Sequence, residues 1–135
     1  MTAGELNSVR NLATQIRTLE KTLHGLRMLA TNLTPLLDGM PHDTTVKSRV
    51  EEVALKIIAA ETELDALQKE FVQAKEQLIN QILGEIDEPV LQTLLILRFV
   101  NLMTWTQIAW QMNYERSWVF RSYQKFSNTL KRHEP

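Results

Sequence analysis

A heptad repeat of apolar residues between Val46 and Ile82 constrains the fold of this chain more than any other feature. The apolar positions are separated by alternating steps of four and three residues, until a last step of four reaches Ile82. This spacing places one continuous seam along a helix and is typical of coiled coils. The seam consists of Val46, Val50, Val53, Ile57, Ala60, Leu64, Leu67, Phe71, Ala74, Leu78 and Ile82. We therefore expect a helix over 46–83, ended by Gly84 as a C-cap.

A second apolar stripe lies before this seam, from Glu5 to about Ala30, and its steps of three and four residues also predict a helix. Pro35 and Gly39 then interrupt the pattern, so a loop is expected over 31–45. The two helices would form a long antiparallel hairpin, coiled-coil-like in its packing, that makes up a first domain over 1–84.

Two helices alone bury their apolar seams poorly, so the predicted hairpin needs further cover. At 1.5 Å per residue the second helix is about 55 Å long and the first about 40 Å, which leaves an overhang. We expect a homodimer in which two hairpins form a four-helix bundle. The alternative is a monomer whose C-terminal part covers the seam. The residues expected at the dimer contact are Val50, Val53, Ile57, Leu64, Leu67, Phe71 and Leu78.

The segment over 87–135 has the layout of a helix-turn-helix module. Asp87 as cap and Pro89 in the first turn predict the start of a helix that reaches about Val100. Thr104 and Gln107 form a capping-box pattern before a short helix. A turn at Asn113 and Tyr114 and a last helix over 116–131 follow. The fold class expected for the whole chain is all-α, a hairpin followed by this module.

Charge and donor side chains favour an anionic partner for the C-terminal part. Residues 1–87 hold nine basic and thirteen acidic residues, whereas residues 88–135 hold six basic and three acidic ones. Chance alone can produce such a difference, and a donor-rich helix face is often only a solvated face. We expect duplex DNA as the partner, with Arg121, Gln124 and Lys125 at base edges. Arg116 and Ser117, on the first turn of the last helix, would lie nearest the floor of the groove. The other candidates would lie nearer the phosphates. The candidate DNA-binding residues are Thr104, Thr106, Arg116, Ser117, Arg121, Gln124, Lys125, Lys131 and Arg132.

The segment from Leu94 to Leu130 resembles region 4 of bacterial sigma factors, which binds the promoter −35 element. The motif T-W-x-x-I-A-x-x-M-N-Y, over 104–114, lies in this segment, and together with G-M-P-H, over 39–42, it carries a second and more specific resemblance. The whole chain is similar to a family of small phage and prophage proteins of unknown function, often regarded as late-gene transcriptional regulators. The resemblance implies transcription regulation in the cytoplasm of a bacterial host, with RNA polymerase as a further partner. This chain has Glu115 where the family pattern usually has a serine cap.

Several other classes of function find no support in the residues. The chain has no cysteine, and His24, His42 and His133 lie far apart without acidic residues at metal-ligand spacing. No phosphate-binding loop, nucleophile elbow or membrane-length apolar run occurs. We expect no enzyme, cofactor, metal site, small-molecule substrate or membrane contact, and we expect core packing or an interface to explain the three tryptophans. The rival to DNA binding is a phage accessory protein that binds a host protein, such as RNA polymerase or a repressor.

Overall fold

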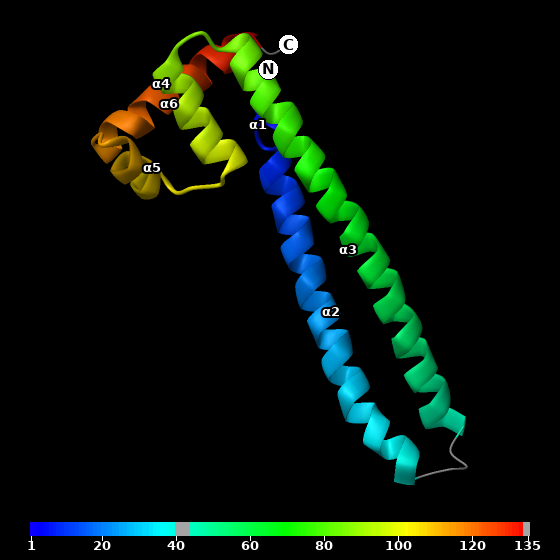
Figure 1. Ribbon diagram of the computed structural model, residues 1–135. Helices are drawn as coiled ribbons and strands as arrows, with labels where there is room; N and C mark the ends of the chain where they lie inside the picture. Colours follow the sequence, from blue (N-terminus) through cyan, green and yellow to red (C-terminus); the bar gives the residue numbers. More distant parts are fainter. Residues whose placement is uncertain (40–43, 134–135) are drawn as a thin grey trace. The chain divides into compact units, whose positions relative to one another are not determined.

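The computed structural model describes residues 1–39 and 44–133, and every regular element in that part of the chain is a helix (Figure 1). This confirms the predicted all-α class. No helix within the described ranges is both long and apolar enough to span a membrane. The elements are α1 (Ala3–Leu6), α2 (Ser8–Gly39), α3 (Thr44–Glu85), α4 (Pro89–Leu95), the π-helix η1 (Ile96–Val100), α5 (Trp105–Met112) and α6 (Arg116–His133).

The helix α2 does not end near Ala30, as the sequence predicted, but continues to Gly39. The predicted loop over 31–45 is therefore wrong in its first part, and residues 40–43, which include most of the G-M-P-H motif, lie outside the described residues. Pro35 lies inside the helix. A proline removes one backbone donor, but the helix persists where other interactions hold the chain.

Two features of α2 lie in the turn that precedes Pro35. The side chain of Leu33 is buried, and the hydroxyl of Thr34 donates a hydrogen bond of 2.8 Å to the carbonyl of Ala30. The apolar burial fixes the helix face, and the hydroxyl bond adds to the backbone hydrogen bonds of the same turn. The burial of Leu33 therefore favours the helical conformation next to the proline.

Residues 14–70 form one compact unit, in which α2 and α3 run antiparallel beside each other (Figure 1). Leu23 of α2 and Val53 and Ala60 of α3 are buried there. An ion pair of 3.1 Å joins Arg27 to Glu61 across the two helices. Along the whole of α3, each of the eleven predicted seam positions is buried or half-buried, so the heptad seam is the inner face of the helix.

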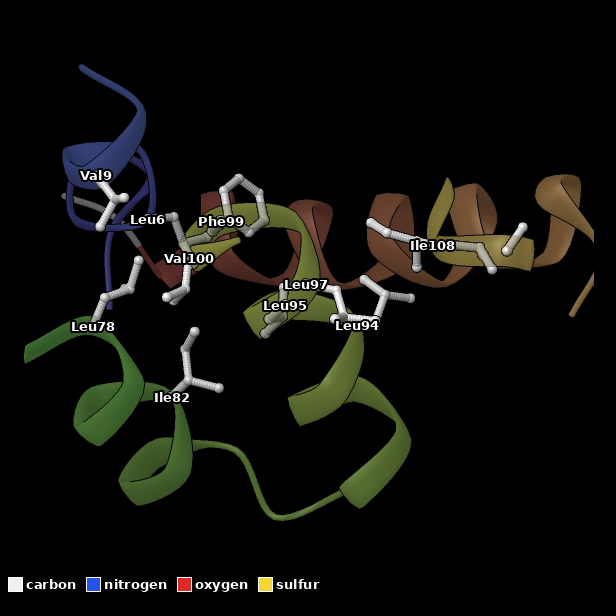
Figure 2. Close-up of a cluster of buried hydrophobic side chains, with 12 residues drawn as sticks. Leu6, Val9, Leu78, Ile82, Leu94, Leu95, Leu97, Phe99, Val100 and Ile108 are labelled. Atoms are coloured by element: carbon white, nitrogen blue, oxygen red, sulfur yellow. The ribbon is translucent and has the colours of Figure 1, made fainter. Parts of the chain in front are cut away.

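Residues 1–13 and 71–135 form the second compact unit, which has its own buried cluster (Figure 2). The ends of both long helices contribute to the same cluster as the C-terminal helices. The contacts therefore do not divide the chain at residue 84, where the sequence predicted a boundary. Its buried members are Leu6, Val9, Leu78, Ile82, Leu94, Leu95, Leu97, Phe99, Val100, Ile108, Ala109 and Val119.

The connection from α3 to α4 differs from the prediction at both of its ends. The helix α3 continues through Gly84, which has no positive φ, and ends at Glu85. The N-cap of α4 is Glu88 rather than Asp87, and its side chain makes no capping bond. Its extended backbone, with φ −77° and ψ 118°, is what the following Pro89 requires of its neighbour. The predicted position of Pro89 in the first turn is confirmed.

The helix that begins at Pro89 changes into a π-helix at Ile96. The amide of Asn101 donates to the carbonyl of Ile96 over 3.0 Å, and the amide of Met103 donates to the carbonyl of Leu97, also over 3.0 Å. Leu102 between them has a left-handed backbone, with φ 57°. This tight turn after η1 leads directly into α5, which begins at Trp105.

Candidate nucleic-acid interface

The helix α5 is capped at both ends, and a short turn joins it to α6. Thr104 and Gln107 form the predicted capping box, in which the Thr104 hydroxyl accepts from the Gln107 amide over 3.2 Å. Asn113 ends α5 in the left-handed conformation, with φ 60° and ψ 38°. Asparagine tolerates this region better than most residues. The amide of Tyr114 donates back to the carbonyl of Ala109 over 3.0 Å, so the turn closes on the helix it follows.

The inner face of α6 packs on α5 and η1 through aromatic rings. Val119 is fully buried, and Tyr123 is half-buried. The ring of Tyr123 lies 5.6 Å from that of Phe99 and 4.9 Å from that of Trp105, between centroids. Phe120 meets Trp105 edge-on at 5.7 Å. These contacts fix the rotation of α6 about its axis and so determine which side chains face outward.

The outward face of α6 is rich in donors and free of carboxylates. Residues 116–133 include five lysines and arginines and no aspartate or glutamate. Within this face, Nε of Arg121 donates to the carbonyl of Ser117 over 3.2 Å, which holds the side chain along the helix. At 100° per residue, the exposed side chains share one face of the helix. The exposed members predicted as DNA-binding are Arg116, Ser117, Arg121, Gln124, Lys125, Lys131 and Arg132.

The start of α5 lies close to the first turn of α6. A pocket of about 520 Å³ is lined by Trp105, Arg116, Ser117 and Phe120. Thr104 is therefore next in sequence to a residue that touches this pocket, and its hydroxyl, which accepts from an amide, keeps a hydrogen for donation. Thr106 lies elsewhere, in a second pocket on the outer side of α5. Thr106 thus lines a different pocket from Arg116 and Ser117, and Thr104 lines neither of the two.

Arg98 is the one basic residue of 88–133 that packs inside the fold rather than on α6. Its Nη1 donates to the carbonyl of Met103 over 2.9 Å, and its guanidinium lies 4.5 Å from the ring centroid of Trp105. Burial lowers the pKa of Arg98 from its ordinary value, and the charge of Arg10 adds to this. Arg98 fastens η1 to the start of α5, so its charge does not belong to the α6 face.

Two carboxylates border this surface. Glu115 is exposed immediately before α6. Glu88 and Lys125 line the same groove between α4 and α6, which has a volume of about 510 Å³. Both carboxylates oppose a polyanion that approaches closely. The part of α6 with the most favourable charge is therefore the outer stripe, which we define by Arg121 and Gln124.

Comparison with known proteins assigns the chain to a family. The sequence profile of the family described as "Protein of unknown function (DUF1492)" matches residues 42–131, two thirds of the chain. The chain belongs to the DUF1492 family. No match was found among curated proteins or among solved structures. The DUF1492 match contains all of α3, α4, η1 and α5 and most of α6.

The DUF1492 segment also exposes aromatic side chains that were not among the predicted site residues. The side chain of Trp110 is 86% exposed on the outer side of α5, where it lines a pocket of about 670 Å³ with Thr106. Tyr114 and Trp118 stack with centroids 4.4 Å apart at the start of α6. Trp105 packs in the fold, whereas the other two tryptophans lie at the surface. Trp110 follows the buried Ile108 by two residues, a spacing that predicts opposite sides of a helix.

The predicted dimer contacts of the DUF1492 segment already have partners within the chain. Val53 and Leu78 are buried, the first against α2 and the second in the cluster of Figure 2. The other five residues are half-buried: Val50, Ile57, Leu64, Leu67 and Phe71. The monomer alternative, in which the C-terminal part covers the end of the seam, agrees with the position of Leu78. A dimer through this seam stays a prediction.

The part of the chain that the structure describes contains no cluster of three or more histidine, cysteine, aspartate or glutamate side chains able to hold a metal ion. His24 is exposed on α2. His42 lies outside the described residues.

Proposed function

We propose that this chain binds double-stranded DNA through the outward face of α6 and acts as a transcriptional regulator. The observation that carries the proposal is the face itself, which is exposed, has five basic residues over 116–133 and has no carboxylate. A basic helix face of this kind provides the electrostatic attraction that dominates the affinity of proteins for DNA. The α5 helix, the short turn and α6 have the connection that helix-turn-helix proteins use to place a helix in the major groove.

The roles of the side chains follow from their chemistry and position. Arg121 has the paired donors suited to a guanine edge, and Gln124 has the donor and acceptor suited to an adenine edge. Both lie on the outer stripe, and Lys125 lies beside them. Lys131 and Arg132, near the end of α6, suit the phosphates, as does the hydroxyl of Thr104. The bond from Arg121 Nε to Ser117 supports this assignment, because it limits the conformations of the arginine before DNA arrives.

The resemblance to sigma factor region 4 supports the same function. It covers η1, α5 and α6, the part of the chain where the exposed basic face lies. A phage regulator that acts in the cytoplasm of a bacterial host, without enzymatic activity, fits both the resemblance and this surface. Serine at the position of Glu115 would remove one of the two bordering carboxylates, so we expect Glu115→Ser to bind DNA more tightly.

The experiment that tests the proposal compares two double variants that each remove two positive charges, one pair from α6 and the other from α2. Fluorescence anisotropy with a labelled random-sequence duplex at low salt measures the affinity of each variant. Arg121→Ala combined with Lys125→Ala should weaken binding at least tenfold. Arg17→Ala combined with Lys21→Ala removes the same charge from exposed positions of α2 and should change the affinity much less. Equal losses in the two double variants would contradict a role for α6.

Selection from a random duplex library then tests base reading. If Arg121 reads a base, Arg121→Ala should cost about 1–3 kcal/mol on the selected site and relax preference at one position. An unchanged preference would remove that assignment while leaving the phosphate contacts in place.

A second candidate function is binding of a host protein without DNA, and the exposure of Trp110 favours it. Exposed tryptophans are common anchors of protein interfaces. Purified bacterial RNA polymerase is the partner to test, since the resemblance implies it. Loss of the complex in Trp110→Ala, together with no duplex binding at low salt, would favour this candidate over the first.

A further inference from the structure

The face of α3 opposite the seam carries a second regular pattern between Ser48 and Asp65. Its positions follow steps of three and four residues, and all of them are exposed. The side chains of Leu55 and Ile58, one turn apart at the middle of the pattern, are 68% and 60% exposed. The full set is Ser48, Glu51, Leu55, Ile58, Thr62 and Asp65. Two large apolar side chains at seam spacing on a solvent face are suited to contact another helix.

Small residues flank this outer seam. Ala54 and Ala59 lie beside the two apolar side chains, Ala66 lies just beyond Asp65, and all three are exposed. Alanine leaves little side-chain volume between two backbones, so a second helix could approach closely and cover Leu55 and Ile58. The α2 helix cannot supply that cover, because it packs on the other side of α3, against Val53 and Ala60.

We propose that a second copy of this chain docks on the outer seam with its α3 antiparallel to the first. A two-fold axis between residues 56 and 57 puts Leu55 of each copy against Ile58 of the other. Four apolar side chains then meet at the centre of the contact. The contact is isologous, as expected for a symmetric dimer.

The charges on the outer seam determine the orientation. A parallel pair in register would put Glu51 against Glu51 and Asp65 against Asp65, and like charges at facing positions are unfavourable. The antiparallel pair puts Glu51 against Thr62 and Asp65 against Ser48, so that no two carboxylates of the outer seam face each other. Lys69 already pairs with Asp65 over 3.1 Å within one helix, which reduces the charge at that end further. Of these two arrangements, only the antiparallel one combines apolar contact at the centre with neutral side chains opposite the carboxylates.

The dependence of solution mass on concentration tests the dimer and its face. Sedimentation equilibrium of the full chain should show a reversible monomer–dimer equilibrium. Ile58→Glu should raise its dissociation constant at least tenfold, with an unchanged far-UV circular dichroism spectrum, because the side chain is exposed. Leu36→Glu, at a 47% exposed leucine of α2 away from the outer seam, is the matched control and should leave the constant unchanged. A monomer at all concentrations, or a dimer that Ile58→Glu does not weaken, would overturn the proposal.

Cysteine crosslinking tests the orientation, and the chain suits it because it contains no cysteine of its own. Ser48→Cys and Asp65→Cys are prepared separately and oxidised alone and as a mixture. In the antiparallel dimer these positions face each other, whereas two copies of either position lie about 26 Å apart along the helix axis. The expected result is a disulfide-linked dimer in the mixture alone. Crosslinking of each variant with itself would indicate a parallel pair and overturn the assigned orientation.

Discussion

The substitution Leu78→Ala tests whether the end of α3 packs in the same cluster as the C-terminal helices. Its side chain is 2% exposed and lies in the cluster of Figure 2 with the buried residues of α4, η1, α5 and α6. Truncation of a buried leucine to alanine removes apolar contacts and leaves a cavity, which costs about 2–5 kcal/mol. With a urea dependence of about 2 kcal/mol per molar for a protein of this size, a loss of about 3 kcal/mol lowers the unfolding midpoint by about 1.5 M.

The assay is urea unfolding followed by tryptophan fluorescence. All three tryptophans lie on α5 or α6, so the signal reports on the C-terminal helices. Leu83→Ala is the matched control, because it makes the same truncation on the same helix at a side chain that is 51% exposed. That variant should shift the midpoint by no more than about 0.25 M, as is usual for surface substitutions.

The two explanations for the burial of Leu78 give different results. If Leu78 packs within its own chain, the large shift is independent of protein concentration. If it faced a second copy, as the sequence predicted, the shift would shrink or grow with concentration. Equal midpoints for the Leu78→Ala and Leu83→Ala variants would refute the shared cluster.

Three further substitutions have specific expected results, the first two measured by the same urea assay. Thr104→Ala should cost about 1 kcal/mol of stability through loss of the capping box, and Thr104→Ser should retain most of it. Asn113→Val should cost about 1–2 kcal/mol because its backbone is left-handed, whereas Asn113→Gly should change stability by a few tenths. The pKa of Glu5 is lowered from 4.5 by the hydrogen bond from Gln81 and then by the amide of Thr2. The stability that ionised Glu5 contributes is therefore present above pH 4.5 and lost as the pH falls through the lower folded-state pKa. Stability measured across pH 2–6 should fall less steeply in Glu5→Gln than in the parent chain, and identical profiles would contradict this role.

The spacing of apolar residues predicted those parts of the fold in which a helix buries a single face. The α3 seam and the buried face of α6 follow directly from steps of three and four residues, because burial of one stripe fixes the rotation of a helix. The capping box at Thr104 was equally predictable, since its two bonds join residues three apart. The exposed donors of α6 follow from the same rotation.

Periodicity cannot say what covers a stripe, and this explains the differences in domain organisation. The seam predicted Leu78 as an inner residue but not that it would share one buried cluster with Leu6, Val9 and Leu94. Local signals also failed where packing overrides them, as at Pro35, which remains inside α2. The π-helix at Ile96 depends on hydrogen bonds to the turn that follows it, and residue composition gives no sign of those bonds.

The salt dependence of duplex binding tests the central claim most directly. Five basic residues of α6 are exposed, and about three to five phosphate contacts give a slope of log affinity against log salt of about −2.7 to −4.5. Removal of one contact, as in Lys131→Ala, should reduce the magnitude of this slope by about 0.9. A flat salt dependence, or no binding of duplex DNA at low salt, would contradict the account.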